Sequence, residues 1–431
     1  PILMSSDGGV YFNTRNTSPA CQTPAWEQPN VTPHGLWLFG MDGANIPNDP
    51  MAENLYFGAQ DDGTFATSNA GASTPSWTNV DCCDSFDFAA NPGRVLYTMC
   101  CFNPGGNFLF SRGNGLSGGG QVNTPPGGLA GFRFPDVIDK FGSDRYVAVG
   151  GNGTFISITA AINWATQLGA ATSPVNACSV QASGPFNNPT FIVQAGTCSG
   201  SSQDRLFRYV GTTANGNWQQ INPPGGVGGF GIFAVDQNNP NRILASHLRA
   251  AGPEMVITTD GGTNWSTMPL LDALMTGNGN FRYQNSRGPT NFTGFGGYVQ
   301  PTLVAFDPND ANTLLAGGSD SGIFLSRNNG TSWTTVTNNS GPPQNPVIPR
   351  PHFAYFDREC GNFNIYIGTQ GRGVWRIRYL DPDRDRLKEC LSNCAAIFDN
   401  CVSKGGRPGN PTEAQCEQFF LQCRHRCQAC P

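Results

Sequence analysis

The sequence has little charge, almost no lysine and no long apolar run. Charged residues make up 13% of the 431-residue chain, and only three of its 25 basic residues are lysines. With a net charge of −5 and no basic cluster, we expect no nucleic-acid partner. No run of about 18 apolar residues is present, so we expect no transmembrane helix. The four histidines, His34, His247, His352 and His425, are not spaced as a helical metal pair.

Glycine and proline are abundant instead, with 55 and 33 residues and no collagen-like period. The 38% of hydrophobic residues fall into many short runs with tight turns between them, which is typical of a folded all-β protein. Fifteen cysteines are many for a reducing compartment, and their spacing contains no complete zinc motif. We therefore expect disulfide bonds and a secreted, extracellular protein.

A repeated unit runs through most of the chain. LVAFDPNDANTLLAGGSDSGIFLSRNNGTSWTTV (303–336) contains four short apolar runs, and related units follow at intervals of roughly 40–50 residues. Six of the eight tryptophans occupy the equivalent place in a unit: Trp26, Trp77, Trp164, Trp218, Trp265 and Trp333. Four antiparallel strands in each unit, repeated in this way, predict a β-propeller.

A short motif, S/T-x-D-x-G-x-x-W, ends the unit. It is complete in one copy and has asparagine in place of aspartate in another: Thr258, Asp260, Gly262 and Trp265, and Ser326, Asn328, Gly330 and Trp333. On this motif the chain resembles the Asp-box, or BNR-repeat, β-propellers, a superfamily that includes sialidases, xyloglucanase-type glycoside hydrolases and sortilin-like receptors. The resemblance covers about residues 1–380 and implies that the boxes lie on the outer rim of the blades.

Asp260 is predicted to have a structural role in its turn. A carboxylate two residues after Thr258 can accept hydrogen bonds from the N–H groups of that turn, while the glycines adopt positive φ. Asn328 can make the same bonds in the other copy. A catalytic carboxylate could not be replaced by an amide, so we interpret both motifs as turns.

The repeat predicts seven or eight blades, because both ends of the propeller region contain incomplete units. Residues 1–28 correspond to strands two to four of a blade, and residues 352–380 to strands one to three. From residue 381 the composition changes: 14 of the last 51 residues are charged, against 41 of the first 380. We therefore predict two domains, an Asp-box propeller at 1–380 and a cysteine-rich helical hairpin at 381–431.

The predicted hairpin contains regularly spaced cysteines. Those on one face of each helix are Cys390, Cys394 and Cys401, and then Cys416, Cys423 and Cys427. The second helix begins with a capping-box pattern at Thr412 and Gln415. An antiparallel pairing predicts three stapling disulfides: Cys390–Cys427, Cys394–Cys423 and Cys401–Cys416.

In the propeller region, cysteines are predicted to pair across neighbouring strands and across the ring closure. The predicted disulfides are Cys82–Cys101, Cys83–Cys100, Cys178–Cys198 and Cys21–Cys360. Cys430 is left unpaired, which suggests either an intermolecular partner or a free thiol.

Enzymatic activity stays open, and no catalytic residue is assigned. A glycoside hydrolase would place two carboxylates across the axial cleft. The candidates by residue type are Asp42, Asp61, Asp62, Asp84, Asp87 and Asp320. FRFP (132–135) is similar to the F-R-I-P motif of sialidases, which implies a carboxylate-binding role for Arg133, although here the motif follows at least two boxes.

An inserted segment at residues 277–300 is the predicted ligand-binding loop, because long loops on rigid propellers commonly carry binding residues. Its aromatic and arginine side chains suit sugar stacking or a protein interface, and they could equally form a small core within the loop. These residues are Phe281, Arg282, Tyr283, Phe292, Phe295 and Tyr298.

Together these features favour a secreted, non-catalytic propeller that binds protein partners or assembles with itself into a filament or surface layer. The cysteine-rich tail would be the attachment element, and carbohydrate is a further candidate ligand. The alternative is an extracellular glycoside hydrolase of the xyloglucanase or sialidase type. No cofactor is expected except calcium, for which the turn DPNDAN (307–312) offers oxygen ligands.

Overall fold

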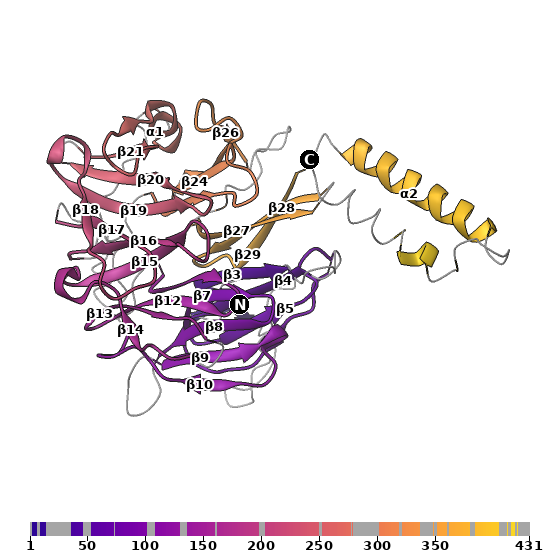
Figure 1. Ribbon diagram of the computed structural model, residues 1–431, viewed down its shortest axis with the longest axis horizontal. Helices are drawn as coiled ribbons and strands as arrows, with labels where there is room; N and C mark the ends of the chain where they lie inside the picture. The colour runs from indigo at the N-terminus through magenta and orange to yellow at the C-terminus, as the bar shows by residue number, and fades with distance from the viewer. Residues whose placement is uncertain are drawn as a thin grey trace.

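The computed structural model is a ring of antiparallel sheets, each formed by consecutive strands of the chain (Figure 1). The described residues are 2–6, 9–13, 36–45, 53–72, 74–100, 108–129, 136–159, 162–197, 203–249, 252–276, 278, 301–318, 321–336, 348, 351–359, 362–379, 384–404, 412, 415–418 and 420. Among these described residues, six sheets have four strands, one has three, and a hairpin forms a two-stranded sheet of its own. The fold is therefore a seven-bladed β-propeller, which decides between the two blade numbers that the repeat predicted.

The strands follow the repeat closely. Blade 1 contains β3 (Leu38–Asn45), β4 (Glu53–Ala59), β5 (Gly63–Thr67) and β6 (Thr78–Asn79). Blade 2 contains β7 (Ser85–Asn91), β8 (Arg94–Met99), β9 (Phe108–Gly113) and β10 (Gly120–Val122). Blade 3 contains β11 (Ile138–Gly142), β12 (Arg145–Gly150), β13 (Gly153–Ser157) and β14 (Thr166–Gln167). Blade 4 contains β15 (Ala177–Ser183), β16 (Thr190–Ala195), β17 (Arg205–Val210) and β18 (Gln219–Ile221).

The remaining blades complete the ring. Blade 5 contains β19 (Gly229–Asp236), β20 (Asn239–Arg249), β21 (Gly252–Thr258) and β22 (Ser266–Thr267). Blade 6 contains β23 (Leu303–Phe306), β24 (Leu314–Gly318), β25 (Gly322–Ser326) and β26 (Thr334–Thr335). Blade 7 contains β27 (Pro351–Glu359), β28 (Asn362–Thr369) and β29 (Val374–Tyr379). The separate hairpin is β1 (Ile2–Ser6) with β2 (Gly9–Asn13), and short 3-10 turns lie at Asn114–Leu116, Ala170–Thr172 and Pro224–Gly226.

Each sheet packs on both of its faces, which explains why the central strands contain short continuous apolar runs. In β24, Leu314 and Ala316 pack with residues of blade 5, whereas Leu315 on the opposite face packs with blade 7. Successive side chains of a strand point to opposite faces, so alternate residues of one run fill two different interfaces. The core of the protein is thus a series of seams between blades.

Tryptophans near the fourth strands extend across these seams. Trp164 packs among residues of blade 2, and its Nε1 donates a hydrogen bond to the carbonyl of Asn123 at 2.8 Å. Trp218 and Trp265 donate in the same way to carbonyls of the preceding blade, at 2.9 Å and 3.0 Å. At these three positions the regular spacing of tryptophan reflects one repeated contact between neighbouring sheets, whereas Trp333 donates to the Gly330 carbonyl of its own turn at 3.1 Å.

The ring closes where blade 7 meets blade 1. The amides of Gly371 and Gly373 donate to the carbonyl of Leu36 at 3.0 Å and 3.2 Å. A side chain at Gly43 would overlap the ring of Tyr355, with a Cβ 2.2 Å from that ring, so glycine is required for the close approach. The predicted closing disulfide Cys21–Cys360 lies outside the described residues.

The C-terminal region contains the first predicted helix and part of the second. Helix α2 (Arg384–Lys404) lies outside the ring in Figure 1, and residues 415–418 are again helical. The disulfide Cys401–Cys416, with its Cα atoms 5.7 Å apart, is present as predicted. Thr412 forms the expected capping box, because its N–H donates to Gln415 Oε1 at 2.9 Å and its Oγ1 accepts from the Gln415 amide at 3.3 Å.

The two predicted bridges at Cys82 and Cys83 are wrong. Both cysteines are free, whereas Cys100 is disulfide-bonded. The amide of Cys100 donates to the carbonyl of Asp84, so Asp84 lies opposite Cys100. The register of the β7–β8 pair explains the error, because Ser85 lies opposite Met99 and the next pair is Asp84 with Cys100, one residue away from the predicted pairing of Cys83 with Cys100.

Other predicted cysteine pairs are only partly within the described residues. Cys178 and Cys394 are both disulfide-bonded, but their predicted partners, Cys198 and Cys423, lie outside the described residues. Neither Cys390–Cys427 nor the unpaired Cys430 is described at the level of side chains. These pairings remain predictions.

Trp164 offers a direct test of the seams. Replacing Trp164 by alanine should lower the free energy of unfolding by about 3–5 kcal/mol, because the indole is 4% exposed and leaves a cavity between blades. Trp77, which is 37% exposed, is the matched control. Its replacement by alanine should lower the free energy of unfolding clearly less. Urea denaturation measures both, and equal losses would contradict this account.

Candidate functional site at the axis and the outer turns

The turn at Asp260 is closed by hydrogen bonds among its own residues. Thr258 Oγ1 donates to Asp260 Oδ1 at 2.8 Å and accepts from the amide of Gly262 at 3.0 Å. The Asn264 amide donates to Asp260 Oδ1 at 2.9 Å, and its side chain donates to Oδ2 at 2.7 Å. These bonds, first those from Asn264 and then that from Thr258, lower the pKa of Asp260 to about 2.

The turn at Asn328 has the same geometry with an amide. Ser326 Oγ donates to Asn328 Oδ1 at 3.0 Å and accepts from the Gly330 amide at 2.8 Å. The Ser332 amide donates to Asn328 Oδ1 at 2.8 Å, as the Asn264 amide does to Asp260. Gly330 has a φ of +80°, in the left-handed region that glycine favours. The carboxylate charge is therefore not needed for this turn.

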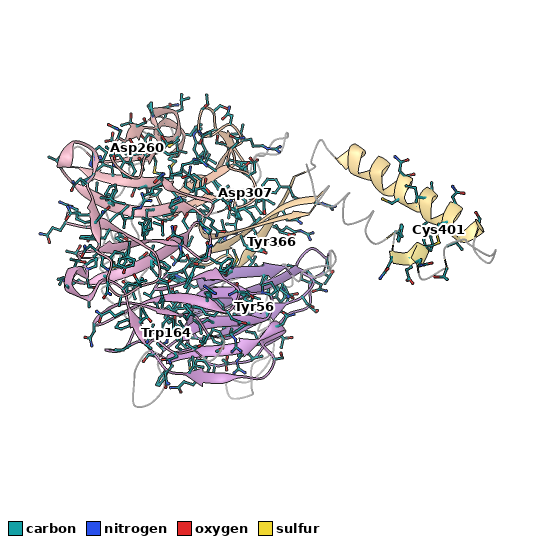
Figure 2. The ribbon with its side chains drawn as sticks, in the orientation of Figure 1. Tyr56, Trp164, Asp260, Asp307, Tyr366 and Cys401 are labelled. Atoms are coloured by element: carbon teal, nitrogen blue, oxygen red, sulfur yellow. A yellow bond between two sulfur atoms is a disulfide. The ribbon has the colours of Figure 1, made fainter. Side chains whose placement is uncertain are left out.

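Asp260 lies at the outer edge of the ring, as Figure 2 shows. Blade 1 contains a third turn of this kind, in which Thr67 Oγ1 donates to Asn69 Oδ1 at 2.7 Å and the Ser76 amide donates to the same oxygen at 3.0 Å. Trp77 follows directly in the sequence. These outer turns organise the ends of blades and bring no catalytic group toward the axis.

The axis is formed by the first strand of each blade, because consecutive first strands lie next to one another around the ring. Asp42 on β3 is the clearest polar centre there. Its Oδ2 accepts from the amide of Ala90 on β7 at 2.7 Å and from the Lys140 ammonium at 2.6 Å. Lys140 also donates to the carbonyl of Ala90 at 2.6 Å. Side chains from blades 1 and 3 thus hold the backbone of blade 2.

Two further side chains connect first strands in the same way. Asp139 Oδ2 accepts from the Ala182 amide at 2.8 Å, which joins blade 3 to blade 4. Gln181 Oε1 accepts from the Val235 amide at 2.8 Å, which joins blade 4 to blade 5. We call these contacts, together with that of Asp42 and Ala90, the interblade clasps. Each satisfies a backbone N–H that the edge of an inner strand leaves without a ladder partner.

Asp87 and Asp136 form a hydrogen-bonded carboxyl pair between blades 2 and 3. Asp87 is 2% exposed, and its Oδ2 also accepts from the Val137 amide at 3.3 Å. Burial raises the pKa of Asp87 to about 7. Burial and then the Asp87 charge raise the pKa of Asp136 well above its ordinary value. Two adjacent buried carboxyls cannot both ionise readily, which is why both pKa values are raised.

The other predicted candidates are dispersed. Asp61 and Asp62 lie in the β4–β5 turn, and Asp84 accepts from the Asp61 amide at 2.7 Å just before β7. Asp307 and Asp310 accept hydrogen bonds within the 307–312 turn, from the amides of Asn309 and Asn312 at 2.9 Å and 3.0 Å. Asp320, Arg133 and the six candidate residues of the predicted binding loop lie outside the described residues. The loop residues concerned are Phe281, Arg282, Tyr283, Phe292, Phe295 and Tyr298.

Sequence reasoning missed Asp136, Asp139, Lys140 and Gln181. One signal was available, because Lys140 is the only lysine among residues 1–380. A single lysine in so long a stretch suggests a specific partner, and that partner is Asp42. The other three side chains follow ordinary strand sequences and had no distinguishing pattern.

The part of the chain that the structure describes contains no group of three or more His, Cys, Asp or Glu side chains that could hold a metal ion. Among the same residues, no helix combines the length and the apolar character needed to span a membrane.

Comparison with known proteins shows the fold. No protein-family model matches the chain, and no curated protein sequence matches it. YCF48 from Cyanidioschyzon merolae is 12% identical with a TM-score of 0.51, covering 82% of this chain and 97% of that chain. An ancestral GH74 enzyme is 15% identical with a TM-score of 0.52, covering 80% of this chain and 49% of that chain. At these identities the likeness establishes a β-propeller and nothing about activity.

Asp87 makes stability depend on pH. Its folded-state pKa of about 7 lies above the unfolded value of about 4, so its contribution is complete below about pH 4 and is lost as the pH rises to about 7. Asp139, whose pKa burial raises to about 6, acts in the same direction. In Asp87→Asn, stability should fall less as the pH rises, because the asparagine amide can donate to ionised Asp136 and still accept from the Val137 amide.

The measurement is the thermal midpoint at pH 4.5, 6 and 8 for the wild type and Asp87→Asn. We expect the midpoint of the variant to fall less over this range and to equal or exceed that of the wild type at pH 8. Asp144→Asn, at an exposed ion pair with Arg94, should retain the wild-type slope. An unchanged slope in Asp87→Asn would overturn the assignment.

Proposed function

We propose that this chain is an Asp-box β-propeller that acts as a secreted, non-catalytic binding and structural module. The propeller would be the interaction body, and the cysteine-rich hairpin at 381–431 the element that attaches it to an extracellular assembly. The outer turns at Asp260, Asn328 and Asn69 support the Asp-box assignment, because all three use the same hydrogen bonds with either an acid or an amide.

The observation that carries the proposal is the use of the axial carboxylates. Asp42 accepts from the Ala90 amide and the Lys140 ammonium through Oδ2, and from the Gly43 amide through Oδ1 at 2.8 Å. Asp139 accepts from the amides of Lys140 and Ala182 at 2.7 Å and 2.8 Å. These donors all belong to the chain itself, and they occupy the carboxylate oxygens that a catalytic acid or base would have to present to a substrate. Their role is to hold blades together.

The carboxyl pair also does not match glycosidase geometry. Glycoside hydrolases keep their two carboxyls about 5–10 Å apart, so that a sugar or a water fits between them. Asp87 and Asp136 are hydrogen-bonded to each other, which leaves no such space. The fold shared with an ancestral GH74 enzyme does not compensate for this, since function depends on the site.

The disulfides support an extracellular location. Cys401–Cys416 is formed, and Cys100, Cys178 and Cys394 are also disulfide-bonded. Such bonds persist in oxidising compartments and are rare in the cytosol. Helix α2 exposes the apolar side chains of Ile397 and Val402, at 55% and 37%, which suits contact with a protein partner.

Activity assays test the non-catalytic part of the proposal. The full chain should release no reducing sugar from xyloglucan or sialylated glycans above the level of an Asp42→Asn/Asp87→Asn double variant. Circular dichroism must show that this control is folded. Hydrolysis that the folded control lacks would favour the glycoside hydrolase instead.

Electron microscopy and non-reducing electrophoresis of native material test the assembly role. We expect repeating particles or covalent oligomers that depend on the C-terminal cysteines. A strictly monomeric particle under these conditions would contradict the structural role, whatever the activity assays show.

A further inference from the structure

Two adjacent thiols lie in the segment that joins blade 1 to blade 2. Cys82 and Cys83 are both free, and their sulfur atoms are 2.9 Å apart. Cys82 is exposed, and Cys83 is half-buried. The two sulfurs are therefore in direct contact, and one of them is open to solvent.

The surrounding contacts hold these thiols in place. Cys83 has a φ of +72° and forms a parallel bridge with Asp62 in the β4–β5 turn. On one side, Asp84 accepts from the Asp61 amide at 2.7 Å. On the other side, Asp81 accepts from the Arg112 guanidinium at 2.7 Å and from the Tyr97 hydroxyl at 2.5 Å. A non-glycine residue at positive φ is costly and persists only where its neighbours enforce it.

We propose that Cys82 and Cys83 form a redox-active vicinal dithiol, which small-molecule disulfides oxidise to a reversible Cys82–Cys83 disulfide. The enforced backbone keeps the sulfurs in contact, so the bond closes without pairing to a distant strand. Oxidation would lock the crossover between the two blades, because Asp62, Asp61 and Arg112 contact the same short segment.

The chemistry is a balanced thiol–disulfide exchange. The Cys82 thiolate attacks one sulfur of the small disulfide, forming a mixed disulfide and releasing one small thiolate. The Cys83 thiol then loses its proton to solvent, and its sulfur attacks Cys82 Sγ and releases the second small thiolate. The protein thus loses two protons and two electrons, and the oxidant is reduced to two thiols.

The order of attack follows from the environment. The hydrogen bond to Cys82, then burial and the charges of Asp84 and Asp61, raises the pKa of Cys83 to about 11. Cys83 therefore keeps its proton and Cys82, which is also more exposed, reacts first.

The bond should be easier to reduce than the structural bridges. Neighbouring Cα atoms are about 3.8 Å apart, shorter than the usual span of about 4.4–6.8 Å in disulfides. Cys401–Cys416 spans 5.7 Å, within the usual range. Strained and exposed disulfides are the labile ones, so Cys82–Cys83 should open first.

The test uses the full chain treated with oxidised glutathione, alkylated, digested without reduction and analysed by mass spectrometry. We expect the peptide containing residues 82 and 83 to be lighter by two hydrogen atoms and to resist alkylation. On titration with dithiothreitol it should reopen at a concentration at least about tenfold lower than Cys401–Cys416. Phenylarsine oxide, a probe that binds adjacent thiols, should block this oxidation.

Two single variants serve as controls. Cys82→Ser and Cys83→Ser should each lose both the mass change and the protection by phenylarsine oxide, and circular dichroism checks that they fold. A cross-link from this peptide to one containing Cys101 or another cysteine would overturn the proposal. Full alkylation of both cysteines after oxidation would overturn it as well.

Discussion

The structure depends on hydrogen bonds between the first strands of neighbouring blades. A propeller places the edge of each inner strand toward the axis, where its backbone N–H groups have no ladder partner. Asp42, Asp139 and Gln181 accept three of these N–H groups from the next blade. Lys140 completes the set by donating both to Asp42 and to the Ala90 carbonyl. The polar axis is therefore a connecting structure.

The seams farther from the axis are apolar. Alternate residues of each central strand pack on opposite neighbours, and tryptophans such as Trp164 donate their indole N–H to the preceding blade. The blades are therefore joined by two independent sets of contacts: polar side chains near the axis, and tryptophans in the seams farther from the axis. Such a rigid body leaves binding to its loops and to the appended hairpin, which is why we favour an interaction role over catalysis.

The repeat was sufficient to predict the fold from the sequence, because one unit defines four strands and its copies define the ring. Two predictions from local sequence patterns were also confirmed, the capping box at Thr412 and the disulfide Cys401–Cys416. The predicted bridges at Cys82 and Cys83 were wrong, because the β7–β8 register places Asp84 opposite Cys100, and the sequence pattern alone did not define that register to within one residue. The clasps join residues about one blade apart in the chain, so no local pattern could reveal their partners.

The most direct test of the account is a double-mutant cycle on Asp42 and Lys140, with Asp42→Asn, Lys140→Met and the double variant compared by urea denaturation. Because this half-buried pair also anchors blade 2, we predict a coupling energy of about 1–3 kcal/mol. The exposed pair Arg94–Asp144 gives the reference, with an expected coupling of about 0–1 kcal/mol. A coupling for Asp42 and Lys140 no larger than that of the exposed pair would contradict the claim that axial charges hold the blades together.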